Sequence, residues 1–442
     1  MKTRTLLEVV ASTTVCVILF WASGSTAGCS SDSSAPAGNA GATSDEASTD
    51  AGQGDDSPDV VLEDANGEPF CDVQIDLPPN HFALPLPTGP YGIARGGRRT
   101  MVDPTRTLEG ALLDAGLEGG TDGEAGPEDS GTDAAVSRPL GVEIWYPSEG
   151  CLSSETVPYL DAEENKVIGL ETVRVHTHAS TKVPFASSLG PRPLLIFSPG
   201  YSGLPRLYTA YIEEVVSRGY VVAAVSHTLW TPVTTFADGS TIPSNKPLSA
   251  VGSEEQIEQY AAIWLADARF VLDELEKVSV SDPLGEVDGH LDLSKVGIFG
   301  HSFGGTTSLS LLVTDQRVKA ALSLVGTVRG PAHGAVTAKS FFIFNEKLSP
   351  ANHTFFYQAT GSAYWAVLDG AGHNFYSDIP FLTREFELTG TDIGSLDPDQ
   401  GSRELRGYLT AFFDFELMGI SSPILDGPTT AYPDVLFYER KP

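Results

Sequence analysis

The chain has 442 residues, of which 41% are apolar and 19% are charged, and its formal net charge is −31. This length and apolar content suffice for one large domain with a buried core. The negative charge, with no basic stripe along the sequence, argues against nucleic acid as a partner because phosphate backbones repel an acidic protein.

The amino terminus has the pattern of an export signal. Lys2 and Arg4 precede an uncharged run over residues 9–21, which is too short to span a membrane comfortably. Small residues at 25–28 then lead to Cys29. We therefore predict a signal peptide over residues 1–28 and an exported protein.

Two segments have compositions that cannot bury enough apolar surface to fold. Residues 30–68 contain ten acidic residues and no Lys or Arg, so residues 29–68 are predicted to be a disordered acidic tether. A second acidic, glycine-rich stretch at about 109–137 is predicted to be a disordered insertion in a surface loop. The folded domain is therefore expected over residues 69–442.

Short, β-rich apolar runs dominate this domain. Residues 100–106 and 140–146 are predicted to form an opening pair of strands, joined across the acidic insertion. The later runs are mostly uninterrupted, as expected of strands that are buried on both faces of a parallel sheet. They cover residues 194–197, 221–225, 296–299, 320–325, 341–344 and 364–368.

Helical patterns alternate with these strands. Residues 254–278 place apolar side chains at steps of three and four, and Ser253 with Gln256 predicts a capping box at the start. A last helix is predicted over 402–417. The stretch 229–252 lacks periodicity and is interpreted as a loop over a pocket. The fold class is therefore α/β, with a mainly parallel central sheet flanked by helices.

One turn in this pattern carries the strongest chemical signal. The residues Gly300-His301-Ser302-Phe303-Gly304-Gly305 lie between the strand at 296–299 and a helical run at 306–313. A Gly-x-Ser-x-Gly sequence between strand and helix is the signature of a nucleophile elbow, in which small neighbours allow a sharp, strained turn. Ser302 is therefore the candidate nucleophile.

Three stretches together resemble the α/β-hydrolase superfamily, most closely the plasma-type platelet-activating-factor acetylhydrolases and the bacterial cutinase-like or polyester-hydrolase-like enzymes. They are Phe-Ser-Pro-Gly-Tyr-Ser-Gly at 197–203, the elbow at 300–305, and Gly-Ala-Gly-His-Asn-Phe at 370–375. The resemblance covers roughly residues 90–420. It implies an α/β-hydrolase fold, a single catalytic domain, and hydrolysis of short-chain, phospholipid-type or polyester carboxylic esters without a cofactor.

A serine hydroxyl needs a base that takes its proton during attack. His373 is the candidate, because it stands where the resemblance places the catalytic histidine. The backbone N–H groups of Tyr201 and Phe303 are expected to form the oxyanion hole. His301 is expected to point away from Ser302, and His227 ends a strand near the pocket.

The acid that would orient His373 is less obvious. In the acetylhydrolases an aspartate follows the strand after the nucleophile helix, but Val325 stands at that position here. Other members of the superfamily take the acid from the end of the next strand, where this chain has Glu346. We predict Glu346 as the acid, with Asp369 as the alternative.

The cysteines bear on localisation. The sequence Ala27-Gly28-Cys29 is similar to a bacterial lipoprotein signal, which implies a lipid anchor on Cys29 and a place in the bacterial cell envelope; otherwise the protein would be secreted. In that oxidising setting the remaining Cys71 and Cys151 are predicted to form a disulfide.

The sequence His176-Thr177-His178 alternates two imidazoles, but no third ligand is evident, so no metal site is predicted.

The expected partner is a small ester or lipid molecule. The alternative function is a non-catalytic surface protein that binds a ligand on a hydrolase scaffold, and Val325 is the residue that favours it.

Overall fold

The computed structural model describes residues 81–110, 136–149, 156–170, 174–247, 249, 251–345 and 348–441. The predicted signal peptide and tether, Cys29, Cys71, Cys151 and Glu346 lie outside these residues, as does most of the acidic insertion. At its edges, Glu109 is described and pairs with Lys246 at 2.6 Å, and Ser137 already belongs to a strand. A search of the described helices finds no membrane span.

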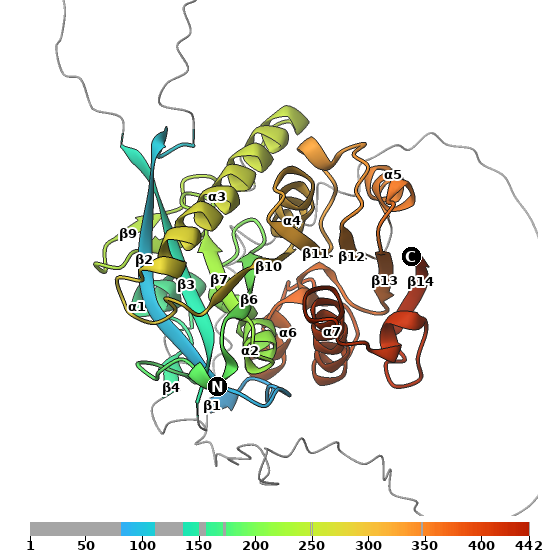
Figure 1. Ribbon diagram of the computed structural model, residues 1–442, viewed down its shortest axis with the longest axis horizontal. Helices are drawn as coiled ribbons and strands as arrows, with labels where there is room; N and C mark the ends of the chain where they lie inside the picture. The colour runs from blue at the N-terminus through green and yellow to red at the C-terminus, as the bar shows by residue number, and fades with distance from the viewer. Residues whose placement is uncertain are drawn as a thin grey trace, which may run out of the picture.

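Within the described residues, twelve strands form one sheet (Figure 1). Its spatial order is β1 (His81–Ala83), β5 (Arg174–Ser180), β2 (Gly92–Thr107), β3 (Ser137–Ser148), β7 (Val221–Ser226), β6 (Arg192–Ser198), β10 (Leu291–His301), β11 (Val318–Leu324), β12 (Ser340–Phe344), β13 (Ala363–Leu368) and β14 (Val435–Lys441), with β4 (Thr156–Pro158) beside β5. Six neighbouring strands pair in parallel, in the spatial order β7, β6, β10, β11, β12 and β13. The strands β3 and β14 border this parallel part on either side and pair with it antiparallel. The predicted mainly parallel sheet is confirmed.

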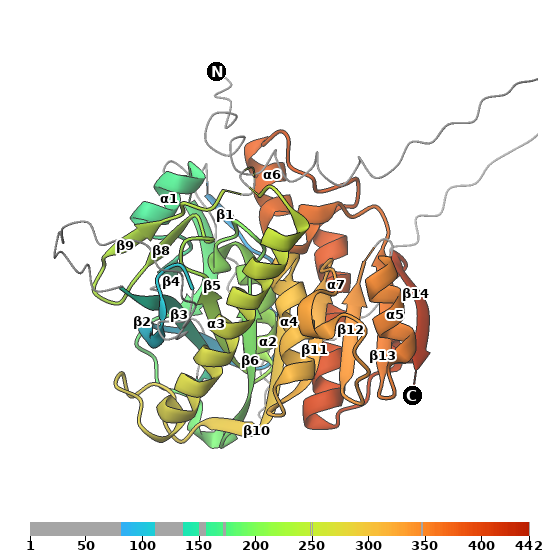
Figure 2. The same ribbon diagram turned by 90° about the horizontal axis from the view of Figure 1, so that it is seen from above.

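Helices cover both faces of this sheet. The helices α2 (Thr209–Ser217), α6 (Ile379–Phe386) and α7 (Pro398–Phe413) pack on one face, and α3 (Glu254–Val280), α4 (Phe303–Thr314) and α5 (Pro350–Gln358) pack on the other (Figures 1 and 2). A short helix α1 (Ala162–Ile168) lies near the β1 end of the sheet.

The alternation of side chains explains why the strand sequences are uninterrupted. In β6, Leu195 and Phe197 enter the core under α2 and α7, while Leu194 and Ile196 enter the core under α3 and α4. Since both faces are covered, the central positions 194–197 of this strand are all buried and all apolar.

Some predicted elements differ from the observed ones. Residues 229–252 are not only a loop, because they contain the hairpin of β8 (Val233–Thr235) and β9 (Thr241–Pro243). The last helix begins at Pro398, four residues earlier than predicted, because the Asp397 side chain accepts the backbone N–H groups of Asp399 and Gln400. Residues Asp414–Met418 then continue it as a π-helical turn.

The predicted capping box of α3 is half correct. The Ser253 hydroxyl accepts the N–H of Gln256 at 3.2 Å, as expected of an N-cap. The Gln256 side chain, however, accepts the N–H of Gly252 at 2.8 Å. It thereby satisfies the residue before the cap rather than the cap itself, so the reciprocal bond of a capping box is absent from α3.

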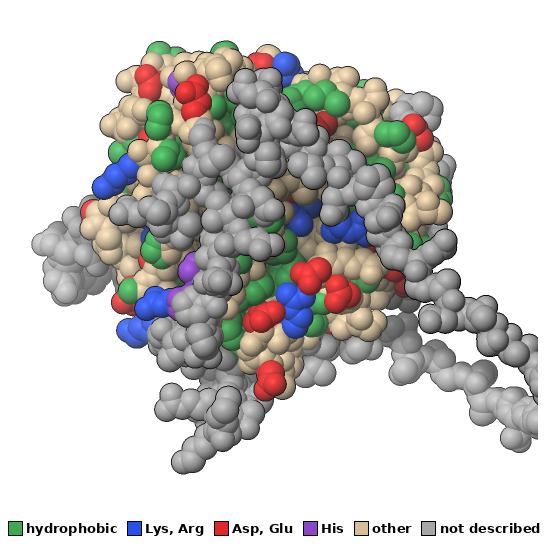
Figure 3. Space-filling model, turned by 90° about the horizontal axis from the view of Figure 1, so that it is seen from below, with side chains coloured by type: hydrophobic (Ala, Val, Ile, Leu, Met, Phe, Trp, Pro, Cys, Tyr) green, Lys and Arg blue, Asp and Glu red, His purple; other side chains and the backbone are tan. Residues whose placement is uncertain are grey.

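Charges on the uncovered part of the face in Figure 3 are mixed, with Lys and Arg side chains beside Asp and Glu side chains. Ion pairs also connect neighbouring helices. Arg384 of α6 pairs with Asp399 of α7 at 2.5 Å, and Arg406 of α7 pairs with Glu214 of α2 at 3.0 Å. The basic residues in these pairs are thus neutralised within the fold.

Candidate active site

Ser302 occupies the turn between the end of β10 and the start of α4, as the sequence predicts. Its backbone has φ 53° and ψ −113°, a combination that is strained for a residue with a side chain. The Ser302 N–H donates to the carbonyl of Leu324 at 2.7 Å, which ties the turn to β11. The serine is thus held at the carboxyl edge of the parallel sheet.

The glycines around Ser302 are required by contact with residues 198–203, which comprise the last residue of β6 and the turn after it and which we call the oxyanion loop after its predicted role. A Cβ added to Gly304 would lie 1.9 Å from the carbonyl oxygen of Ser198. One added to Gly300 would lie 2.5 Å from that same oxygen and from the backbone of Gly304. The elbow and the oxyanion loop therefore touch through backbone atoms, which leaves no room for side chains.

His373 reaches Ser302 from the loop after β13. Its Nε2 atom lies 3.0 Å from the Ser302 Oγ atom, which is hydrogen-bond distance. The two residues are 71 positions apart in the sequence. The loop is backed by residues 391–394, because Gly372 donates its N–H to Ile393 and Asn374 donates its N–H to Asp392. The structure therefore brings together the two residues that the sequence assigns as nucleophile and base.

Burial lowers the pKa of His373 below its ordinary value, and the negative charge of Asp392 opposes that shift. The carboxylate of Asp392 also accepts the backbone N–H of His373 at 3.3 Å. The imidazole is consequently neutral at neutral pH, which is the state that can accept a proton from a hydroxyl. No pattern in the sequence had indicated Asp392, which stands on a loop 19 residues beyond His373.

Phe303 follows the candidate nucleophile in the chain, and Tyr201 contacts Phe303. Phe303 is the first residue of α4, so its N–H has no acceptor inside the helix. Tyr201 stands in the oxyanion loop, and its ring meets the Phe303 ring edge-on with centroids 5.7 Å apart. The neighbouring N–H of Gly200 is already bound, because it donates to the Tyr208 hydroxyl at 3.1 Å.

His301 points away from the Ser302 hydroxyl, as expected, but it has contacts that the sequence did not reveal. Its Nδ1 lies 2.9 Å from the Tyr208 hydroxyl, and its Nε2 lies 2.8 Å from the carbonyl oxygen of His373. Burial lowers the pKa of His301 to about 3, so the ring is neutral. It donates to His373 through Nε2 and accepts from Tyr208, which links the His373 loop to the Gly200 amide.

The triad acid remains a prediction. Glu346 lies outside the described residues. The alternative, Asp369, is exposed, and its carboxylate accepts the N–H of Gly370 at 3.1 Å. Val325, at the position where the acetylhydrolases have aspartate, keeps a positive φ of 51° at the end of β11.

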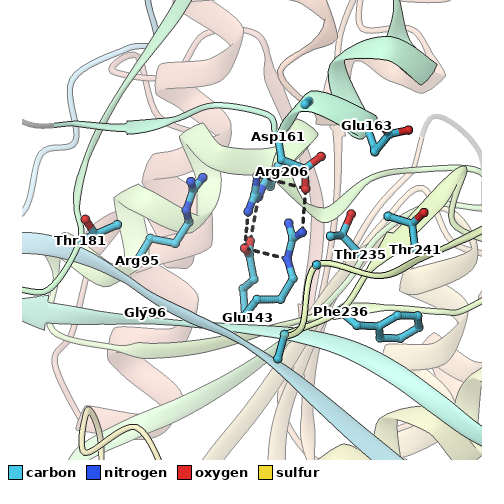
Figure 4. A pocket seen from close by; sticks show the side chains of 14 residues that line it. Arg95, Gly96, Glu143, Asp161, Glu163, Thr181, Arg206, Thr235, Phe236 and Thr241 are labelled. Atoms are coloured by element: carbon cyan, nitrogen blue, oxygen red, sulfur yellow. Dashed lines mark hydrogen bonds and ion pairs between the residues drawn. The ribbon is translucent and has the colours of Figure 1, made fainter.

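A cavity of about 450 Å³ lies elsewhere, among β2, β3, α1 and the β8–β9 hairpin, and does not include Ser302 or His373. Figure 4 shows Glu143, Asp161 and Arg206 converging there. Glu143 accepts two bonds from Arg206, at 3.0 and 2.5 Å, and Arg206 also lies 4.0 Å from Asp161. The guanidinium group of Arg206 thus pairs with the carboxylates of Glu143 and Asp161. These pairs fix the short turn Pro205–Tyr208, from which the Tyr208 hydroxyl contacts the oxyanion loop.

Among the described residues, no group of three or more His, Cys, Asp or Glu side chains is arranged to hold a metal ion. The alternating histidines take other partners. His176 lies 2.8 Å from His81, and His178 lies 2.9 Å from Glu213. These contacts tie β5 to β1 and to α2.

A mainly parallel sheet with a Gly-x-Ser-x-Gly elbow after β10 and a histidine after β13 defines an α/β hydrolase. The comparisons with known proteins agree. The family described as "Platelet-activating factor acetylhydrolase, isoform II" matches residues 140–256 and 275–404, which is more than half of the chain. The chain belongs to that family.

Individual relatives and one solved structure support the same placement. The chain is 23% identical over 274 residues to a probable 1-alkyl-2-acetylglycerophosphocholine esterase of Arthroderma benhamiae, which covers 56% of this chain and 66% of the relative. It is 30% identical over 219 residues to a platelet-activating factor acetylhydrolase of Cavia porcellus, covering 43% and 49%. The chain thus spans about half to two thirds of these curated relatives.

A ferulic acid esterase from Streptomyces cinnamoneus has a similar structure, with a TM-score of 0.63 and 27% sequence identity. The similarity covers 81% of this chain and 99% of the esterase. The structural similarity therefore extends over almost the whole length of a solved esterase.

Proposed function

We propose that this protein is a serine carboxylic ester hydrolase that acts through an acyl-enzyme. The observation that carries the proposal is the 3.0 Å contact between the His373 imidazole and the Ser302 hydroxyl at a strained elbow. Membership of an acetylhydrolase family and structural similarity to an esterase support the same reaction class.

In the proposed reaction the Ser302 oxygen attacks the ester carbonyl carbon while its proton passes to His373 Nε2. The tetrahedral intermediate then collapses, the bond to the alkoxide leaving group breaks, and His373 returns the proton to it. Water repeats the sequence on the acyl-Ser302 ester and releases the carboxylic acid. The proton balance requires only one neutral imidazole, and the lowered pKa of His373 supports that state.

The intermediate carries negative charge on the former carbonyl oxygen. We assign its stabilisation to the N–H groups of Phe303 and Tyr201. The helix position of Phe303 favours this role, because the first N–H groups of a helix are free and carry partial positive charge. Loss of one such donor costs about 2.7 to 4 kcal/mol of transition-state stabilisation in other enzymes.

We assign Glu346 as the acid that orients His373. Its chain neighbour Asn345 follows β12, the strand between β11 and the strand that leads to His373. The Asn345 N–H donates to Ala366 of β13 at 3.0 Å, and the Val325 N–H donates to Phe344 at 2.8 Å. An acidic residue at this point of the sheet edge would stand between the Ser302 and His373 strands.

The substrate proposed is a short-chain ester, with phospholipid-type and polyester esters as the competing classes. The relatives named as acetylhydrolases and as a 1-alkyl-2-acetylglycerophosphocholine esterase favour an acetyl ester of a lipid. A chain-length series of p-nitrophenyl esters separates these classes, because a short-chain enzyme loses kcat/KM steeply as the acyl group lengthens.

We also propose that the protein is exported, with residues 1–28 as the signal, a lipid anchor on Cys29 and a disulfide between Cys71 and Cys151. The sequence patterns described above support these assignments. Fatty-acid labelling that survives in Cys29→Ala would refute the anchor. Free-thiol labelling of Cys71 and Cys151 in the native exported protein would refute the disulfide.

The decisive experiment for the reaction combines a substrate and a covalent probe. The wild-type protein should release a burst of p-nitrophenol from p-nitrophenyl acetate and react with a fluorophosphonate at Ser302. The Ser302→Ala variant should do neither. Full turnover by that variant would eliminate Ser302 as the nucleophile.

The second candidate is a ligand-binding protein without catalysis, which the valine at position 325 favours. The same probe distinguishes it. A wild-type protein that binds an ester but neither hydrolyses it nor reacts with the fluorophosphonate would be a binding scaffold rather than an enzyme.

A further inference from the structure

A buried hydrogen-bond network of serine, histidine and aspartate lies at the start of the oxyanion loop, apart from Ser302 and His373. The Ser198 Oγ atom is 3.0 Å from His227 Nε2, and His227 Nδ1 is 2.9 Å from the Asp267 carboxylate. All three side chains are completely buried. A substrate cannot reach Ser198 there, so this buried hydrogen-bond network must have a role other than nucleophilic attack.

The charges around Asp267 fix the direction of these hydrogen bonds. Arg138 donates to both carboxylate oxygens of Asp267 at 2.7 Å, and Arg106 donates to one of them at 2.7 Å. Burial alone would raise the pKa of Asp267, but the charge and hydrogen bonds of Arg138, with the hydrogen bond from His227, hold it far below its usual range. The carboxylate therefore accepts the Nδ1–H of His227, which leaves Nε2 to accept the Ser198 O–H.

His227 also supports an aromatic stack that leads to the candidate oxyanion donors. Its ring lies flat on Trp264, with centroids 3.8 Å apart and an interplanar angle of 12°. Trp264 in turn meets Phe303 edge-on at 4.9 Å and lies parallel to Tyr201 at 6.3 Å. The two residues whose N–H groups would bind the oxyanion thus rest on the same indole.

Ser198 provides the other support. It begins the oxyanion loop, and its carbonyl oxygen is the atom that Gly304 approaches so closely that no Cβ fits. One buried imidazole therefore fixes the start of this loop through Ser198 and the rings of Tyr201 and Phe303 through Trp264. Its own orientation is set by Asp267 and the two arginines.

We propose that His227 is a positioning residue that holds the two oxyanion N–H groups at the spacing the transition state requires. The inference rests on the proposed esterase function and adds a residue to it. Loosening this support should weaken transition-state binding more than substrate binding, because the charge on the oxygen develops only in the transition state.

The test uses His227→Asn, in which the amide nitrogen can still donate to Asp267 while the stacked ring and the Ser198 contact are lost. Expressed per fluorophosphonate-titrated site, kcat for p-nitrophenyl acetate should fall by about 10- to 100-fold, in keeping with the cost of a misplacement of about 1 Å. KM should stay within about threefold. Affinity for a trifluoromethyl ketone, which mimics the tetrahedral intermediate, should fall in parallel with kcat.

Two further variants keep the outcome decisive. Ser198→Ala removes only one hydroxyl and should lower kcat by about 3- to 10-fold with the same unchanged KM, so it decides the question if His227→Asn does not fold. His353→Asn, at an exposed histidine on α5, serves as the control and should match the wild type.

The proposal is wrong if the folded variants keep wild-type kcat and ketone affinity, or if KM rises in step with the loss of kcat/KM. Failure of the proposed function gives a different result. In that case the wild-type protein itself shows no turnover and no fluorophosphonate labelling.

Discussion

The carboxyl group of Asp378 should make the stability of this protein depend on pH. Asp378 is fully buried and lies five residues beyond His373. It accepts the N–H groups of Thr209 and Ala210, at 2.8 and 3.1 Å, and the hydroxyl of Tyr159 at 2.9 Å. It therefore anchors the histidine-bearing segment to the start of α2.

Burial raises the pKa of Asp378 to about 7, although the hydrogen bonds from Tyr159, Ala210 and Thr209 act in the opposite direction. In the unfolded chain the pKa of an aspartate is about 3.9. Between these values the folded protein keeps a proton that the unfolded chain has released, so the free energy of unfolding falls as pH rises. At about 1.36 kcal/mol per pH unit the loss amounts to roughly 4 kcal/mol, complete once the pH passes about 7.

Asp378→Asn removes this titration while keeping a neutral side chain of the same size. Urea unfolding followed by tryptophan fluorescence, from about pH 4 to about pH 8, measures the difference. The free energy of unfolding of the variant minus that of the wild type should rise by roughly 4 kcal/mol across the range. Asp288→Asn, at an exposed aspartate, should give a constant difference. If the wild type instead gains stability over Asp378→Asn as pH rises, the helix N–H groups outweigh burial and the reasoning is wrong.

Three further predictions concern the site. Glu346→Gln should lower kcat by about 10⁴-fold if Glu346 orients His373, and a loss below tenfold in a folded variant would remove it from the triad. Asp392→Asn takes away the charge that opposes the effect of burial on the pKa of His373, so the acidic limb of the kcat/KM profile should move to lower pH; a move to higher pH would contradict this. Gly304→Ala places a Cβ 1.9 Å from the Ser198 oxygen, so it should lower the free energy of unfolding by about 1 to 3 kcal/mol and remove most of the reactivity toward the fluorophosphonate. The control Gly252→Ala, whose added Cβ has only a 3.8 Å contact, should match the wild type. Normal fluorophosphonate labelling of Gly304→Ala would show that the elbow can relax.

The sheet and the elbow were predictable because their signals are local. The strand at residues 194–197 is apolar at each position since both of its faces are covered. The turn at Ser302 needs small neighbours because other backbone packs against it. Glycines at fixed positions before and after Ser302 therefore indicate the turn in the sequence. Boundaries were less predictable. The final helix starts at Pro398 because Asp397 happens to cap it, and the hairpin within 229–252 has strands of only three residues.

The sequence by itself indicated the fold class and the candidate pair of Ser302 and His373, since each lies in a short glycine-containing motif and the motif of His373 resembles that of the acetylhydrolases. Only the tertiary structure placed His227 against Ser198 and Asp267, and Asp392 against His373. These partners come from different strands, helices and loops, and no periodicity relates their positions in the chain. Their polar side chains have a defined partner only after the sheet has brought the segments together and excluded water from around them.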